Sequence, residues 1–182
     1  MTGYQQAILY LSGAYTGDRF CVRNVDRHFV DAVRDCFQQS VSPFLQHRTG
    51  DAKKDYWCIK SAQADKPSLS DVSDFSGFCR GFLELQGGID AHYVRHRNTR
   101  RLAIRLRIRG AEDDLKFVAR HLPAKPKKMQ YISTHTGHTF ALYYQSRAEI
   151  LDILDFIDGF PKNTAVWEKW WETINTTQKP QA

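Results

Sequence analysis

The arginines between residues 101 and 109 are the part of this sequence whose chemistry is clearest. In Arg101-Leu-Ala-Ile-Arg-Leu-Arg-Ile-Arg109, cationic and aliphatic residues alternate. Successive side chains of a β-strand point to opposite faces, so this alternation predicts a strand with one apolar and one cationic face. Guanidinium groups bind phosphates and guanine edges through paired hydrogen bonds. The segment therefore favours nucleic acid as the partner.

The residues around this strand add to its positive charge. No Asp or Glu occurs from Ala91 to Gly110. A solvated outer sheet face is the alternative explanation, but such faces usually mix lysine with glutamate. We expect nucleic-acid contacts from Arg95, Arg97, Arg100, Arg101, Arg105, Arg107 and Arg109. Basic residues on other predicted hairpins extend the same surface, namely Arg48, Lys53, Lys54, Lys125, Lys127, Lys128, His135 and His138.

Size and composition are those of a globular protein with an anionic partner. The 182 residues are 42% hydrophobic and 25% charged, with a formal net charge of +6. This length suits one compact domain or two packed half-domains. The positive charge favours nucleic acid or a membrane surface. Since no apolar run approaches the roughly 20 residues of a membrane span and no signal segment is apparent, we expect an intracellular protein without a membrane partner.

The four cysteines have the spacing of buried thiols. They lie far apart in apolar-patterned segments, and no Cys-x-x-Cys pair is present. Four free thiols are therefore favoured over a zinc site or two disulfides. The residues concerned are Cys21, Cys36, Cys58 and Cys79.

Two parts of the chain resemble each other. Residues 48–61 are echoed by 135–146 as the second halves of hairpins, and the helical pattern of 69–75 is echoed by 150–156. Upstream in each half we expect a helix with glycines one turn apart. These pairs are Gly13 with Gly17 and Gly77 with Gly81. Glycines on one helix face permit close approach of a second helix.

The second half has the clearer order of elements. After the helix at 76–87 the patterns predict strands at 89–97 and 100–109, a helix at 111–122, strands at 128–135 and 138–145, and a helix at 147–158. This order is αββαββα. In the first half a strand at 19–24 runs into a helix at 26–38, which indicates that one strand has been lost.

Over residues 4–160 these features resemble the double-motif LAGLIDADG homing endonucleases. The two copies of the motif are Leu11-Ser-Gly-Ala-Tyr-Thr-Gly-Asp-Arg19 and Cys79-Arg-Gly-Phe-Leu-Glu-Leu-Gln-Gly87. The resemblance implies an α+β fold of two pseudo-symmetric αββαββα half-domains, the first shortened, packed through their motif helices under a saddle of antiparallel strands. The halves would be 1–75 and 76–160, followed by a tryptophan-rich helix and tail at 161–182, whose apolar stripe favours core packing over partner binding.

The resemblance also implies a metal site. In the family the eighth motif residue of each copy binds a divalent metal, which assigns Asp18 and Gln86 to a shared Mg²⁺ and Lys60 to the neighbourhood of the scissile phosphate. Glutamine offers a carbonyl oxygen without charge, whereas phosphodiester hydrolysis uses anionic ligands. Glu84, two residues before Gln86, would point elsewhere on the helix.

Three functions follow. The first, which the resemblance implies, is a monomeric, site-specific, metal-dependent endonuclease or nickase that acts on double-stranded DNA. The second is an inactive derivative that binds DNA or RNA as a regulator or maturase. The third is an oligomeric module in which the tryptophan tail docks to a partner protein and the arginines meet an acidic one.

Overall fold

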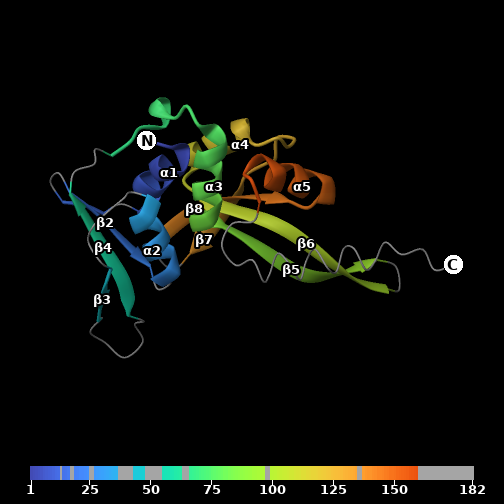
Figure 1. The fold of residues 1–182 in the computed structure, drawn as a ribbon. Coiled ribbons are helices and arrows are strands. Elements are labelled where there is room, and N and C mark those ends of the chain that lie inside the picture. The colour runs from blue at the N-terminus through green and yellow to red at the C-terminus, as the bar shows by residue number, and fades with distance from the viewer. Residues whose placement is uncertain are drawn as a thin grey trace. The chain divides into compact units, whose positions relative to one another are not determined.

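The computed structural model describes residues 1–12, 14–16, 19–24, 27–36, 43–47, 55–62, 66–96, 99–134 and 137–159. The chain divides into two compact units, Met1–Leu85 and Gln86–Ala182. Each contains its own four-stranded antiparallel sheet (Figure 1). The half-domain boundaries expected from the repeat, 1–75 and 76–160, stay predictions. The predicted tryptophan helix at 161–182 lies outside the described residues.

Unit 1 follows the order expected of a LAGLIDADG half. Its elements are α1 (Gly3–Ser12), β1 (Ala14–Thr16), β2 (Arg19–Asn24), α2 (Arg27–Cys36), β3 (Phe44–Gln46), β4 (Tyr56–Ala62), the 3-10 helix η1 (Leu69–Asp71) and α3 (Phe75–Gln86), which belongs to this unit as far as Leu85. The strands lie in the order β1-β2-β4-β3. We call this sheet A.

One face of sheet A forms the core of unit 1. Val22 on β2 and Ile59 on β4 are cross-strand partners, and both are buried. They share a cluster with Ile8 of α1 and with the apolar stripe of α2, which includes Val30 and Val33. Because strand side chains alternate, Cys21, Arg23, Cys58 and Lys60 belong to the opposite face, which we call the outer face.

Unit 2 repeats this topology. Its elements are β5 (Gly87–His96), β6 (Thr99–Gly110), α4 (Glu112–His121), β7 (Gln130–Thr134), β8 (Gly137–Tyr144) and α5 (Arg147–Phe156). Its four strands form a second sheet, which we call sheet B. Their order, β5-β6-β8-β7, is equivalent to the order β1-β2-β4-β3 of sheet A. Leu106 and Ile108 of β6 pair with Tyr144 and Leu142 of β8, and all four are buried. α4 contacts β6 and β8 and buries Leu115 and Val118.

The elements predicted for the second half are confirmed. Every strand and helix predicted between residues 89 and 158 is present, with ends that shift by a few residues at most. The long β5 and β6 hairpin stands out in Figure 1. Strong apolar alternation and clear turn residues mark these elements, so local pattern and tertiary structure agree.

Three expectations for the first half are wrong. The motif helix ends at Ser12 rather than near residue 18, since 14–16 form a strand. No strand has been lost, because that strand, β1, pairs with β2. The pattern at 69–75 gives only a 3-10 turn before α3. The first two have one cause: β1 is three residues long, too short to show a period that distinguishes it from a continuing helix.

The predicted close packing of two helices at small residues is confirmed for α1 and α3. A Cβ on Gly81 would lie 2.8 Å from the Cβ of Ala7 and 3.1 Å from the carbonyl oxygen of Tyr4. A Cβ on Gly3 would collide with the backbone at Asp74 and Phe78. Gly3 and Ala7 of α1 therefore make close contacts with α3, while the role expected of Gly13 and Gly17, which lie outside the described residues, stays a prediction.

One carboxylate binds the N-terminal ends of both helices. Asp74 accepts a hydrogen bond from the Gly77 N–H at 2.9 Å and another from the Gly3 N–H at 2.8 Å. The first N–H groups of a helix have no partner within the helix, and an anion there also meets the positive end of the helix dipole. Asp74 thus fixes the starts of α1 and α3 against each other.

The cysteines whose side chains are described are free and buried, as predicted. They are Cys21, Cys58 and Cys79. The Sγ atoms of Cys21 and Cys58 lie 2.9 Å apart. Burial is the main cause that raises the pKa of the Cys58 thiol to about 11 and that of Cys79 to about 12. The side chain of Cys36 is not described.

Candidate nucleic-acid interface

The alternation predicted for β6 is present wherever its side chains are described. Leu106 and Ile108 are fully buried, whereas Arg109 is exposed and Arg105 and Arg107 are half-buried. These three arginines therefore lie on the face of sheet B opposite the buried Leu106 and Ile108, and we call this the outer face of sheet B. Arg109 is the most open of them to solvent.

Neighbouring residues orient two of these arginines. The Cζ of Arg105 lies 4.5 Å from the ring centroid of Tyr143, a stacking distance for a guanidinium over an aromatic ring. Arg107 is the cross-strand partner of Gly88, where an added Cβ would come within 3.8 Å of its Nη2. Arg105 is thus held against Tyr143, and Arg107 extends over the position where Gly88 has no side chain.

The remaining arginines of the hairpin are placed by their backbone. Arg95 pairs with Arg100, and Arg101 pairs with Val94. Asp90 is the cross-strand partner of Arg105 and the one acidic residue among the described positions of β5 and β6, which carry six arginines. The net charge of the hairpin is strongly positive.

The other predicted contacts are scattered or not described. Lys128 is exposed in the loop before β7, and His138 lies on β8 opposite Ser133. Lys125 is exposed in the same loop as Lys128, and its backbone N–H bonds to Glu149 at 3.3 Å. Outside the described residues lie Arg97, Arg48, Lys53, Lys54 and His135.

Lys127 forms an ion pair within unit 2. Its Nζ lies 2.7 and 2.8 Å from the two carboxylate oxygens of Glu149 on α5. The same Nζ lies 5.7 Å from the ring centroid of Tyr144. The Glu149 side chain is only 14% exposed, so this pair is largely shielded from water. The ammonium of Lys127 attaches the loop to α5.

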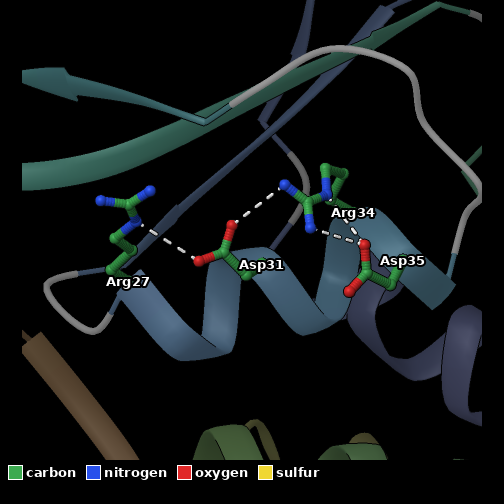
Figure 2. Close-up of polar contacts among 4 residues, drawn as sticks. All are labelled: Arg27, Asp31, Arg34 and Asp35. Atoms are coloured by element: carbon green, nitrogen blue, oxygen red, sulfur yellow. Dashed lines mark hydrogen bonds and ion pairs between the residues drawn. The ribbon is translucent and has the colours of Figure 1, made fainter.

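The arginines of α2 form ion pairs with carboxylates of the same helix. Figure 2 shows Arg27 and Arg34 flanking Asp31, with Arg34 also contacting Asp35. Arg27 is further stacked over Trp57, with its Cζ 4.6 Å from the ring centroid. Since these charges compensate each other along the helix, α2 is an ordinary solvated surface. The described positions of β5 and β6, by contrast, carry six arginines and one acidic residue.

Sheet A has a cationic outer face that the sequence did not reveal. The Arg23 Cζ lies 5.6 Å from the ring centroid of Tyr56, and the Lys60 Nζ lies 5.6 Å from that of Phe44. Arg23 and Lys60 are both exposed. In both sheets an arginine stacks on a tyrosine that lies diagonally across from it on the neighbouring strand. Arg23 stacks on Tyr56 but has Cys58 as its cross-strand partner. Arg105 stacks on Tyr143, whose own cross-strand partner is Arg107. Only the register could have identified Arg23, Tyr56 and Tyr143.

Of the two metal-binding residues that the resemblance implies, the structure describes Gln86. It is the last residue of α3 and precedes Gly87. The helix α1 ends at Ser12, the residue before Gly13. Neither residue is acidic.

Serine and glutamine side chains carry no negative charge, whereas Mg²⁺ prefers carboxylate ligands. Among the residues that the structure describes, no three His, Cys, Asp or Glu gather to hold a metal. Glu84 accepts a hydrogen bond from the Tyr4 hydroxyl at 2.7 Å and lies 3.6 Å from Arg80, so it joins α1 to α3 instead. Asp18 lies outside the described residues, and its role stays a prediction.

Comparison with known proteins identifies the fold. No protein-family model matches the sequence, and no curated protein matches it significantly. A solved structure of I-SmaMI, bound to an uncleaved DNA target in the presence of calcium ions, matches all of this chain and 95% of its own with a TM-score of 0.66 and 7% identity.

Two structures of DUF199/WhiA are also similar. Its N-terminal LAGLIDADG domain matches 91% of this chain and 85% of its own, with a TM-score of 0.53 and 16% identity. The full-length protein from Thermatoga maritima matches 99% of this chain with a TM-score of 0.55 and 15% identity, and this chain spans 61% of that protein. Among the described helices none is long and apolar enough to cross a membrane.

Proposed function

We propose that this chain, which has a LAGLIDADG-type fold, binds double-stranded DNA and has lost metal-dependent cleavage. The observation that carries binding is the outer face of β6, where Arg105, Arg107 and Arg109 follow one another on a paired strand backed by buried Leu106 and Ile108. A rigid row of guanidinium groups suits phosphates and the edges of bases in the major groove.

Sheet A supports the same function independently. Its outer face carries Arg23 and Lys60, each beside an aromatic ring. The solved DNA complex of I-SmaMI shares this fold, and WhiA is a further protein with it. Binding by both sheets would give contacts along an extended DNA site, as the double-motif organisation implies.

Loss of cleavage follows from the residue types at the two helix ends. We place the first motif position at Ser12, the last residue of α1, and neither Ser12 nor Gln86 provides a negative charge for a metal. A divalent cation held by neutral oxygens alone would bind weakly. We therefore favour a regulator or another binding protein over an endonuclease or nickase that uses Asp18, Gln86 and Lys60.

Two assays on one duplex separate these functions. Retention of a labelled mixed-sequence duplex at low salt tests binding, and incubation of that complex with Mg²⁺ or Mn²⁺ tests cleavage. We expect salt-sensitive retention and no nicked product. Failure to retain DNA would overturn the proposal. Cutting that Asp18→Asn abolishes would restore the endonuclease function, and preferred retention of RNA would identify an RNA-binding protein.

A further inference from the structure

Phe44 occupies an unusual place on the outer face of sheet A. It lies on the edge strand β3 and is the cross-strand partner of Cys58, so it shares a face with Arg23 and Lys60. Its contact with the Lys60 ammonium confirms that orientation. The side chain is nevertheless 40% exposed. An exposed aromatic ring thus stands within a cationic surface.

The surroundings of Phe44 suit a nucleic acid better than a protein core. The described residues of this face are Cys21, Arg23, Phe44, Gln46, Tyr56, Cys58 and Lys60, none of which is acidic. Asp55, which lies just before β4, forms an ion pair with His47 at 2.8 Å. The charged groups among the described residues of this face are therefore the cations Arg23 and Lys60.

An exposed aromatic ring beside a lysine can recognise particular groups of a DNA base pair. In the major groove each thymine presents a 5-methyl group, the one apolar contact that a base pair offers there, and phenylalanine is among the residues that bind it. A lysine beside the ring can donate to a phosphate or to the acceptors of a neighbouring guanine. An apolar contact and a cation side by side match two adjacent base pairs.

We propose that Phe44 is a specificity-determining residue that recognises the 5-methyl group of thymine, with Lys60 contacting the adjacent phosphate or guanine. The inference rests on the proposed binding of duplex DNA. It also gives a reason for the chain to select DNA over RNA, because uracil lacks this methyl group.

The test removes one methyl group at a time. A duplex selected from a random pool is prepared with each thymine replaced in turn by deoxyuridine, and the affinity of the full chain is measured. We expect at least one position where the replacement weakens binding by about fourfold, the effect of withdrawing one buried methyl group. In Phe44→Ala the same replacement should have no effect.

Leu45 provides the matched control. It is also 40% exposed, but it pairs with Trp57 and belongs to the opposite face. Leu45→Ala should keep the penalty for deoxyuridine, and thermal unfolding should show that both variants are folded. A selected site that prefers thymine nowhere, or a penalty that persists unchanged in Phe44→Ala, would overturn the inference. Failure to bind any duplex would instead refute the proposed function.

Discussion

Lys127 and Lys128 are adjacent, yet their surroundings give them different roles. Both oxygens of Glu149 bind the ammonium of Lys127, and that carboxylate is largely buried. Lys127→Ala leaves it without its cation, so we expect the free energy of unfolding to fall by about 1–3 kcal/mol in urea titrations. Lys128 is exposed, and Lys128→Ala should leave stability unchanged.

DNA titrations of the same two variants test the assignment of Lys127 to structure. Lys128→Ala should weaken binding at low salt more than Lys127→Ala does, when both are measured well below their unfolding temperatures. If folded Lys127→Ala lost more affinity than Lys128→Ala, Lys127 would belong to the DNA interface.

The buried thiols predict how stability depends on pH. The pKa of Cys79 is raised from an ordinary value of 9.0 to about 12, chiefly by burial. Below pH 9 the thiol is protonated in both the folded and unfolded chains. Above pH 9 only the unfolded chain ionises, so stability should fall by about 1.4 kcal/mol per pH unit.

Urea unfolding of the native chain and of Cys79→Ala between pH 8 and pH 10.5 measures this effect. The difference between the two curves isolates Cys79, because Cys58, whose pKa is also raised, is present in both. The variant should lose less stability with increasing pH. Parallel curves would show that the Cys79 thiol ionises as readily in the folded chain as in the unfolded one.

At the scale of elements, the contact between α1 and α3 depends on small residues that face each other. Gly81→Ala places a methyl group 2.8 Å from the Cβ of Ala7, which cannot rotate away. We expect a loss of about 1–3 kcal/mol from overpacking, which outweighs the roughly 1 kcal/mol gained in helix propensity. Ala7→Gly in the same chain should restore most of this loss in urea titrations. If Gly81→Ala alone were stabilising, the helices would not approach this closely.

The elements that sequence predicted well are those whose pattern is long. β6 spans twelve residues with regular alternation, and its arginine face needed no tertiary information. β1 spans three residues, and the glycines around it suggested a helix that does not extend so far. The helix ends at Ser12, and the assignment of Asp18 to a metal site stays a prediction.

The candidate site could be predicted only in part, because its contacts depend on which strands and loops lie side by side. Alternation along a strand identifies a face, but the residue beside a side chain depends on the register of the neighbouring strand. The stacking of Arg105 on Tyr143 and of Arg23 on Tyr56 arises from such pairings. The ion pair of Lys127 arises from a loop that meets α5. None of these contacts has a signature in the linear sequence.

At the scale of the whole molecule, charge is distributed by element. Helical cations such as those of α2 are compensated by carboxylates one turn away, whereas the outer faces of the two sheets carry arginine and lysine beside aromatic rings. The two units share one strand order, and each presents such a face. This distribution, rather than the net charge of +6, supports DNA binding.

The salt dependence of binding tests that claim most directly. Arg109 on the outer face of β6 and Arg120 on α4 are both exposed, so Arg109→Ala and Arg120→Ala remove one charge each. If Arg109 contacts a phosphate, its loss should reduce the slope of log affinity against log salt by about 0.9, whereas loss of Arg120 should leave the slope unchanged. Equal slopes for both variants would contradict the assignment of the sheet face as the DNA-binding surface.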